Sequence, residues 1–246
     1  MPAENKQAII IFSRLPIGQE TKTRLADLLN ENQREKLHVM MWSDIFSEIM
    51  KLSDNINIFL YCTGSGNINN YKNFIPENFI LRQQSGLNLG EKMKNAMQEI
   101  FNSGYNRVVL IGSDIPSLRH ENIKRAFDSL NHSDVVIGSS KDGGYWLIGM
   151  RKFIPEVFNI SESKWGNSSV LDSTVMKLND SGISYKFADT LQDLDTPDDI
   201  KIFMSQAHNQ DRKTYKYLSQ ELITILLNKK RLSESDAQML FRSEEH

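Results

Sequence analysis

Three acidic turns contain the residues best suited to chemistry. Asp142 is followed by Gly143 and Gly144 at the head of an apolar run. Two glycines there sacrifice chain entropy and packing, which is costly unless a ligand must approach the backbone. Asp114 directly follows another apolar run, and Asp195 lies in an acidic segment further on. Carboxylates in such places can hold a hard cation. The three turns together predict a strand-end site for a divalent metal and a ligand that carries phosphate.

Each turn also has an ordinary structural explanation. Asp-Gly is a common hairpin pattern, and an aspartate before Pro116 can serve a turn or a cap. The acids of segment 193–199 can be explained as capping of a helix that opens at Thr196. However, Asp193 and Asp195 would point the same way if that segment is extended, so either could complete a metal site with Asp114. Thr196 already supplies a cap. Asp195 is therefore the second metal-ligand candidate, beside Asp114.

A basic segment follows the first apolar run. Ser13 and Arg14 end that run, and Lys22 and Arg24 follow a loop with one proline and one glycine. We expect a helix over about 22–30, and free N–H groups at its start together with two cations would suit a nucleotide's phosphates. Surface cations on a solvated turn are the alternative. The P-loop spacing is absent, which removes the main support for a kinase or ATPase.

Apolar and amphipathic segments alternate along the chain, as in α/β proteins. We expect strands at 7–13, 56–62, 107–111, 134–138, 144–150 and 184–188, a loop at 63–71, and helices at about 22–30, 34–51, 89–102, 119–130 and 168–181 and from 196. This order implies a mostly parallel, three-layer sheet. Ligands of such sheets sit beyond the carboxyl ends of the strands, which brings the basic segment and the acidic turns toward one crevice.

Composition narrows the class of protein. The chain has 246 residues, 39% of them hydrophobic, so it can bury a full core. A net charge of −2 argues against a nucleic-acid or membrane-surface binder. Cys62 is the one cysteine, which fits a reducing compartment. No run reaches membrane-spanning length and the first residues lack the regions of a signal peptide, so we expect a cytoplasmic protein. The five histidines lack metal-ligand spacing and are expected to be mostly solvated.

The last part of the chain differs from the rest. From about residue 206 the composition becomes polar and rich in lysine, followed by an apolar stripe over 215–227 and a charged tail. We therefore expect one domain over 1–205 and a helical extension over 206–246. The extension is a candidate lid or homodimer contact.

Several separated motifs carry a family resemblance. They are, in chain order, residues 13–25, 84–93, 112–116, 142–149, 164–166 and 193–199. Their order resembles the bacterial radical-SAM/selenodomain-associated transferase family, a glycosyltransferase-like branch of the nucleotide-diphospho-sugar transferase superfamily. The match covers about residues 9–203. Agreement of several motifs in one order is more specific than any single motif.

The resemblance implies a fold and a set of roles. The fold would be a three-layer α/β/α Rossmann-like mixed sheet of the glycosyltransferase A type, working with Mg²⁺ or Mn²⁺. Asp114 would be the metal-binding acid, and Lys22 and Arg24 would face the phosphates. From the residues alone, we expect Gly143, Gly144 and Tyr145 to contact substrate. Trp165 could line the acceptor pocket, and a packing role for it is equally compatible with the sequence.

Three functions are compatible with these residues. The first is glycosyl transfer from a nucleoside diphosphate sugar to a small-molecule acceptor, with Asp142 as general base for the incoming hydroxyl. The second is nucleotidyl transfer, in which a substrate phosphate attacks the α-phosphate of a nucleoside triphosphate and pyrophosphate leaves. The third is a nucleotide-sugar binding module without turnover. The residues favour the first weakly, and retention of all three acidic turns speaks against the third.

Overall fold

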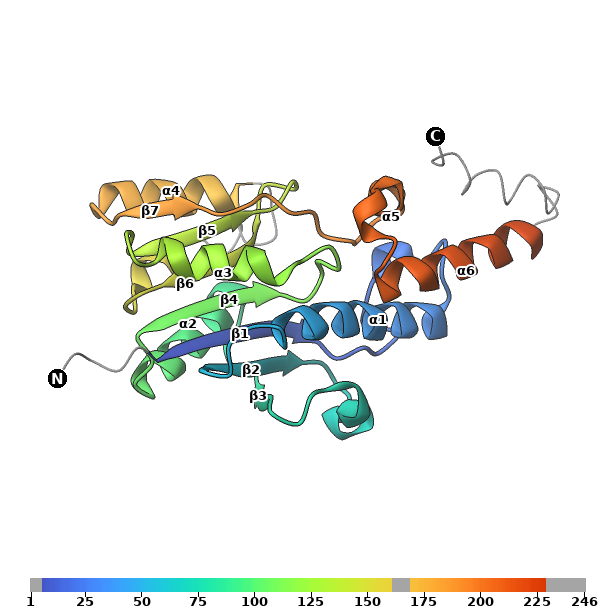
Figure 1. Ribbon diagram of the computed structural model, residues 1–246, viewed down its shortest axis with the longest axis horizontal. Coiled ribbons are helices and arrows are strands. Elements are labelled where there is room, and N and C mark those ends of the chain that lie inside the picture. Colours follow the sequence, from blue (N-terminus) through green and yellow to red (C-terminus); the bar gives the residue numbers. More distant parts are fainter. Residues whose placement is uncertain (1–5, 161–168, 229–246) are drawn as a thin grey trace.

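The computed structural model describes residues 6–160 and 169–228, and these form a seven-stranded sheet between layers of helices. The strands are β1 (Gln7–Arg14), β2 (Ile56–Thr63), β3 (Ile80–Gln83), β4 (Arg107–Gly112), β5 (Val135–Ser139), β6 (Tyr145–Met150) and β7 (Tyr185–Phe187). Their order across the sheet is β3-β2-β1-β4-β6-β5-β7 (Figure 1). The expected α/β fold is confirmed.

The sheet is mixed because one strand runs backwards. β6 pairs antiparallel with both β4 and β5, whereas the other pairs, β1 with β2, β1 with β4, β2 with β3 and β5 with β7, are parallel. Only the short turn 140–144 joins β5 to β6, and a connection of that length can make a hairpin but no parallel crossover. The hairpin places the start of β6 beside the carboxyl end of β4, and so beside Asp114.

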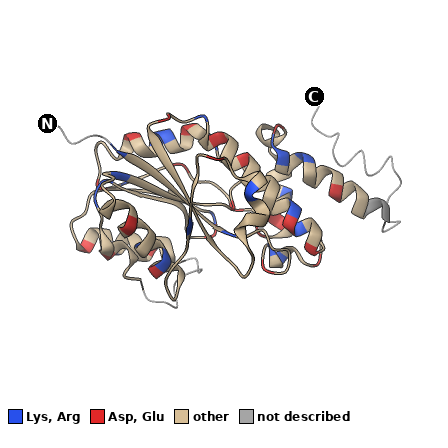
Figure 2. Cartoon of the chain, turned by 90° about the horizontal axis from the view of Figure 1, so that it is seen from below, with Lys and Arg blue, Asp and Glu red and all other residues tan. Residues whose placement is uncertain are grey.

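Helices cover both faces of the sheet. α1 (Glu31–Ile49) and α3 (His120–Ser129) bury their apolar sides on one face, and α2 (Leu89–Asn102) and α4 (Val170–Asp180) on the other. The central strands are buried on both faces, which explains their uninterrupted apolar runs. In Figure 2 acidic and basic residues are intermixed on the helices, while the strands are largely free of them.

The carboxyl-end side of the sheet carries two further helices. α5 (Pro197–Ser205) and α6 (Lys213–Asn228) lie beyond the end of the sheet toward which β1 and β2 point (Figure 1). Thr196 caps α5 as expected, in a reciprocal capping box with Asp199. Asp44 of α1 accepts hydrogen bonds from the backbone N–H groups of Lys213 and Thr214, both 2.8 Å long, and so fixes the start of α6 against α1. Whether residues 206–246 form a separate unit stays a prediction.

Two sequence expectations on local structure were wrong. Residues 22–30 form no α-helix: only the 3-10 turn Thr23–Leu25 appears there, after Lys22 with its left-handed φ of 49°. The segment ends at Asn30, which caps α1, and the carbonyl of Leu29 bonds to the guanidinium of Arg34. Part of the expected loop at 63–71 belongs to a 3-10 helix at Ile68–Phe74. The edge strand β3 was missed as well, because it is only four residues long and half of it is polar.

The described residues contain no helix that is both long and apolar enough to cross a membrane.

Candidate active site

Two carboxylates that are far apart in the sequence meet at a single ammonium group. Lys22 Nζ lies 2.5 Å from Asp114 Oδ1 and 2.8 Å from Asp195 Oδ1. A backbone hydrogen bond of 2.9 Å, from Leu194 N to Asp114 O, ties the two acidic turns together. Asp114 and Asp195 therefore lie on the same side of the molecule, at the carboxyl end of β4. Carboxylates brought this close could share a cation.

Lys22 is held in place by both its backbone and its burial. Its side chain is only 2% exposed. Burial by itself would lower the pKa of Lys22, but the charges of Asp114 and Asp195 outweigh it and raise that pKa. The ammonium is therefore charged and offsets part of the negative charge of the two acids. In the structure the ammonium of Lys22 contacts carboxylates, and its expected role in binding phosphates stays a proposal.

A cleft of about 500 Å³ opens around this group. Eight of the predicted site residues line it: Arg14, Lys22, Arg24, Asp114, Asp142, Gly144, Tyr145 and Asp195. Asp193, the alternative to Asp195, also lines it. So do residues that the sequence analysis did not select, including Thr21, His38, Leu89, Met93 and Val170. Trp165 lies outside the described residues.

The hairpin turn holds Asp142 at the edge of this cleft. Asp142 Oδ1 accepts hydrogen bonds from Ser140 Oγ at 2.5 Å and from Gly144 N at 3.0 Å. Gly143 has a φ of +86°, a conformation that favours glycine, and it shapes the turn without lining the cleft. A side chain at position 144 would meet Ser140 Oγ at 3.2 Å. Both glycines therefore serve the geometry that presents Asp142.

Asp193 adds a further carboxylate to the cleft. It alternates with Leu194, which is 1% exposed and packs in the core, so Asp193 and Asp195 both reach the cleft. Burial, together with the charges of Asp114, Asp142 and Asp195, raises the pKa of Asp193 to about 8. The sequence alternation pointed to this residue but could not show its burial.

The donor set fits a divalent cation. Five carboxylate side chains line one cleft, namely Glu20, Asp114, Asp142, Asp193 and Asp195, and two of them converge on a single positive charge. Oxygen ligands of this kind suit Mg²⁺ and Mn²⁺. Lys22 carries one positive charge against the two carboxylates that it contacts, so negative charge is left over for a cation. Asp114 and Asp195 are the residues that would hold such an ion.

Ser13 is placed below the cleft and not in it. Its side chain is buried, and its hydroxyl contacts Ser113 Oγ at 2.7 Å, His38 Nε2 at 3.1 Å and Trp42 Nε1 at 2.8 Å. The hydroxyl is thus used inside the protein. Ser13 supports the residue before Asp114, and the structure gives its side chain no access to a phosphate.

His38 is a buried member of the same network, and so an exception among histidines that were expected to be mostly solvated. Its ring is 2% exposed and bonds Ser13 on one side and Thr21 Oγ1 on the other. Burial lowers the pKa of His38 to about 4, so the imidazole is neutral at pH 7. His38 therefore links Thr21, the residue before Lys22, to Ser13 near the end of β1. Its sequence context contained no pattern that revealed this.

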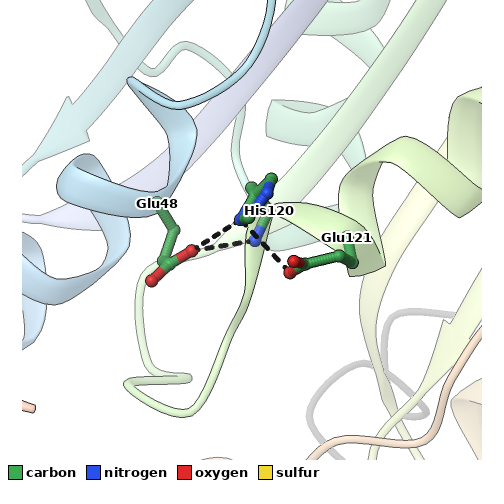
Figure 3. A group of neighbouring side chains, drawn as sticks. All are labelled: Glu48, His120 and Glu121. Carbon is green, nitrogen blue, oxygen red and sulfur yellow. Dashed lines mark hydrogen bonds and ion pairs between the residues drawn. The ribbon is translucent and has the colours of Figure 1, made fainter. Parts of the chain in front are cut away.

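A second cluster of ligand-type side chains lies outside the cleft. Glu48, His120 and Glu121 approach one another where α1 meets the start of α3 (Figure 3). Glu48 Oε1 also lies 2.8 Å from Lys51 Nζ and 2.9 Å from Arg212 Nη1. Because these cations already neutralise Glu48, we interpret the cluster as an ion-pair network that joins α1, α3 and the start of α6.

This network predicts a pH-dependent contribution to stability. Burial alone would raise the pKa of Glu48, but hydrogen bonds from Lys51 and His120 and the charge of Arg212 lower it to about 2. A lowered carboxyl pKa stabilises the fold above the unfolded value, and that stability is lost as the pH falls through the folded value. We expect Glu48→Gln to destabilise the protein by about 3 kcal/mol at pH 7, measured by urea unfolding.

The pH series supplies the check on this prediction. The difference in free energy of unfolding between wild type and Glu48→Gln should shrink as the pH falls from about 4.5 toward 2. Glu121→Gln is the matched control, because Glu121 belongs to the same cluster but is 53% exposed. It should change stability by less than about 1 kcal/mol. If the stability difference between wild type and Glu48→Gln did not change with pH, the charge of Glu48 would not be its cause.

The sequence resembles curated transferases over most of its length. It is 28% identical over 227 residues to the 2-phospho-L-lactate guanylyltransferase of Methanobrevibacter smithii, covering 87% of this chain and 92% of that protein. It is 26% identical over 214 residues to the enzyme of the same name from Methanocaldococcus vulcanius, covering 85% and 89%. Residues 48–167 match the family model described as "Uncharacterized protein conserved in bacteria (DUF2064)".

Solved structures show the same architecture. A "putative nucleotide-diphospho-sugar transferase" from Desulfovibrio desulfuricans G20 superposes with a TM-score of 0.82 at 29% identity, covering 91% of this chain and 98% of that one. A cytidylyltransferase from Leptospira borgpetersenii superposes with a TM-score of 0.55 at 12% identity, covering 92% and 96%, and shows the fold alone. The chain is therefore an enzyme of the transferase class with the nucleotide-diphospho-sugar transferase-like fold, and its residues 48–167 match the DUF2064 family.

Proposed function

We propose that this protein is a metal-dependent nucleotidyltransferase that moves a nucleoside monophosphate from a nucleoside triphosphate to a phosphorylated small molecule. The observation that carries the proposal is the meeting of Asp114 and Asp195 at Lys22, in a cleft that also holds Arg14 and Arg24. The curated relatives support this function over glycosyl transfer, which the sequence alone had favoured weakly. Membership of the radical-SAM/selenodomain-associated branch stays a prediction.

The cleft residues can be assigned to the steps of this reaction. An oxygen of the acceptor's phosphate attacks the α-phosphorus, the bond from that phosphorus to the oxygen bridging to the β-phosphorus breaks, and pyrophosphate leaves with the bonding electrons. Arg14 and Arg24 line the cleft and would bind the triphosphate, with Lys22 offsetting charge beside them. Mg²⁺ or Mn²⁺, held by Asp114 and Asp195, would supply further neutralisation of the phosphates.

A second hollow beside the cleft is the candidate site for the nucleoside. It has a volume of about 540 Å³ and is lined by residues of the loop after β2 and by Leu81, Arg82 and Gln83. Glu20, which lines the cleft, accepts hydrogen bonds from the hydroxyl and the backbone N–H of Ser65, which lines the hollow. We propose that the base lies in this hollow and the phosphates lie in the cleft.

Product analysis tests the proposal against its alternatives. The full chain would be incubated with each nucleoside triphosphate, Mg²⁺ or Mn²⁺, and 2-phospho-L-lactate as a probe acceptor. Pyrophosphate release that depends on the acceptor supports nucleotidyl transfer. Release of a nucleoside diphosphate from nucleotide sugars, without any pyrophosphate from triphosphates, would establish glycosyl transfer in its place. Nucleotide binding without either product would indicate the binding module.

The two transfer reactions differ in what they require of Asp142. A hydroxyl acceptor needs a general base, whereas a phosphate acceptor is already ionised at pH 7 because its second pKa is about 6. We therefore expect Asp142→Asn, which keeps the acceptor oxygen for Gly144 N, to lower kcat by less than about tenfold in nucleotidyl transfer. A loss of about 100-fold or more, the size typical of a missing general base, would favour the glycosyl reading.

A further inference from the structure

The cleft and the hollow adjoin at two places in the chain. Arg14 lines the cleft, and Leu15, the next residue, lines the hollow. Glu20 lines the cleft, and its carboxylate accepts hydrogen bonds from the hydroxyl and the backbone N–H of Ser65, which lines the hollow. A ligand that fills both spaces therefore crosses beside the Glu20 carboxylate.

The backbone around this junction is held by hydrogen bonds. Leu15 donates its N–H to the carbonyl of Thr63 at 2.8 Å, which ties the start of the loop to the end of β2. Glu20 donates its own N–H to the carbonyl of Ile17 at 2.8 Å, which closes the loop into a turn. Gly64 has a φ of +134°, and a β-carbon there would lie 3.1 Å from Glu20 Oε2. Glycine at this position therefore lets the carboxylate approach the loop after β2 closely.

The carboxylate of Glu20 is an ionised hydrogen-bond acceptor. The hydrogen bonds from the hydroxyl and the backbone N–H of Ser65 lower the pKa of Glu20, so the group is charged at pH 7. An ionised carboxylate has about four acceptor positions, and the bonds from Ser65 use two of them. Such a group repels phosphate and suits a ligand part that donates hydroxyl hydrogens.

The ribose is the part of a nucleotide that joins the base to the phosphates. Its 2′- and 3′-hydroxyls are neighbouring donors on one side of the ring, and a carboxylate can accept hydrogen bonds from both. With the base in the hollow and the phosphates in the cleft, the ribose lies at the junction that Glu20 occupies.

We propose that Glu20 binds the ribose hydroxyls of the nucleoside triphosphate, and that this contact distinguishes a ribonucleotide from a nucleotide without these hydroxyls. The proposal rests on the proposed function and on the placement of base and phosphates given there. It makes Glu20 a specificity-determining residue for the sugar of the nucleotide.

The test compares GTP with 2′,3′-dideoxy-GTP, which lacks both hydroxyls. Binding of each to the full chain would be measured by calorimetry with Mn²⁺ present. We expect wild type to bind GTP about tenfold to 100-fold more tightly, because hydrogen bonds to a charged group are lost in the analogue. In Glu20→Gln this ratio should fall to about threefold or less. The ratio is the readout, because removing a negative charge near the triphosphate changes both affinities alike.

Two further variants separate ribose binding from a purely structural role of Glu20. Glu31→Gln is the matched control, because Glu31 is exposed at the start of α1 and lines neither space. Ser65→Ala removes a hydrogen bond to Glu20 but keeps the carboxylate. Both variants should keep the wild-type ratio within about twofold. If Glu20 only held the loop, Glu20→Gln would weaken both nucleotides equally and leave the ratio unchanged.

Three outcomes would overturn the proposal: equal affinity of wild type for the two nucleotides, an unchanged ratio in Glu20→Gln, or loss of the ratio in Ser65→Ala. A failure of the proposed function looks different. GTP binding without pyrophosphate release would count against nucleotidyl transfer and would leave the ribose measurement intact.

Discussion

Replacing Asp114 by asparagine is expected to abolish Mn²⁺-dependent nucleotide binding while leaving the protein folded. Asparagine keeps the shape of the side chain but removes the charge, and a hard divalent ion depends on that charge. Lys22 retains Asp195 as a partner at 2.8 Å, so no buried ammonium is left without a counter-ion. We expect the Mn²⁺-dependent part of nucleotide affinity to fall on the order of 100-fold or more.

Calorimetry with GTP, in the presence and absence of Mn²⁺, measures this effect. Asp198→Asn is a suitable control, because Asp198 is 80% exposed at the start of α5 and pairs with Lys201 on the surface. It should leave both affinities unchanged. If Asp114→Asn retained the full effect of Mn²⁺ on GTP binding, Asp114 would not belong to the metal site.

Replacing Lys22 by methionine is expected to move metal binding and turnover in opposite directions. The ammonium contacts both carboxylates that would hold the ion, so it competes for the same oxygens. Without it, Mn²⁺ affinity in the absence of nucleotide should rise on the order of tenfold, since a like charge beside the dication is removed. Nucleotidyl transfer should fall by about 100-fold or more, because a charge that stabilises the phosphates is lost.

The comparison of Lys22→Met with Arg24→Met makes this prediction specific. Arg24 lines the cleft and is exposed, whereas Lys22 is buried between the two acids. Methionine at position 22 also has a β-carbon, so it meets the left-handed backbone with no more strain than lysine. Arg24→Met should change Mn²⁺ affinity by less than about threefold. Weaker Mn²⁺ binding in Lys22→Met would show that the ammonium supports the metal site and does not compete with it.

The alternation of strands and helices could be predicted from the sequence because it depends on the apolar pattern within each segment. Central strands such as Ile9–Phe12 are buried on both faces and must be apolar throughout, and the helix at Leu89–Asn102 begins and ends where its apolar stripe does. β3 was not predicted because an edge strand of four residues is too short to show a hydrophobic alternation. The region after Lys22 was misread because the carbonyls of Thr21 and Leu29 accept hydrogen bonds from the guanidinium of Arg34, a side-chain contact that no local pattern reveals.

The sequence by itself determined the α/β class and the chemical types in the acidic turns and the basic segment, because strand-end position and residue type follow from local pattern. Only the tertiary structure decided that Lys22 lies between Asp114 and Asp195, that Asp193 joins them, and that His38 and Ser13 are buried supports. These outcomes depend on which loops the sheet order brings together and on how deeply each group is buried. Contacts between residues so far apart in the chain leave no periodicity in a single sequence.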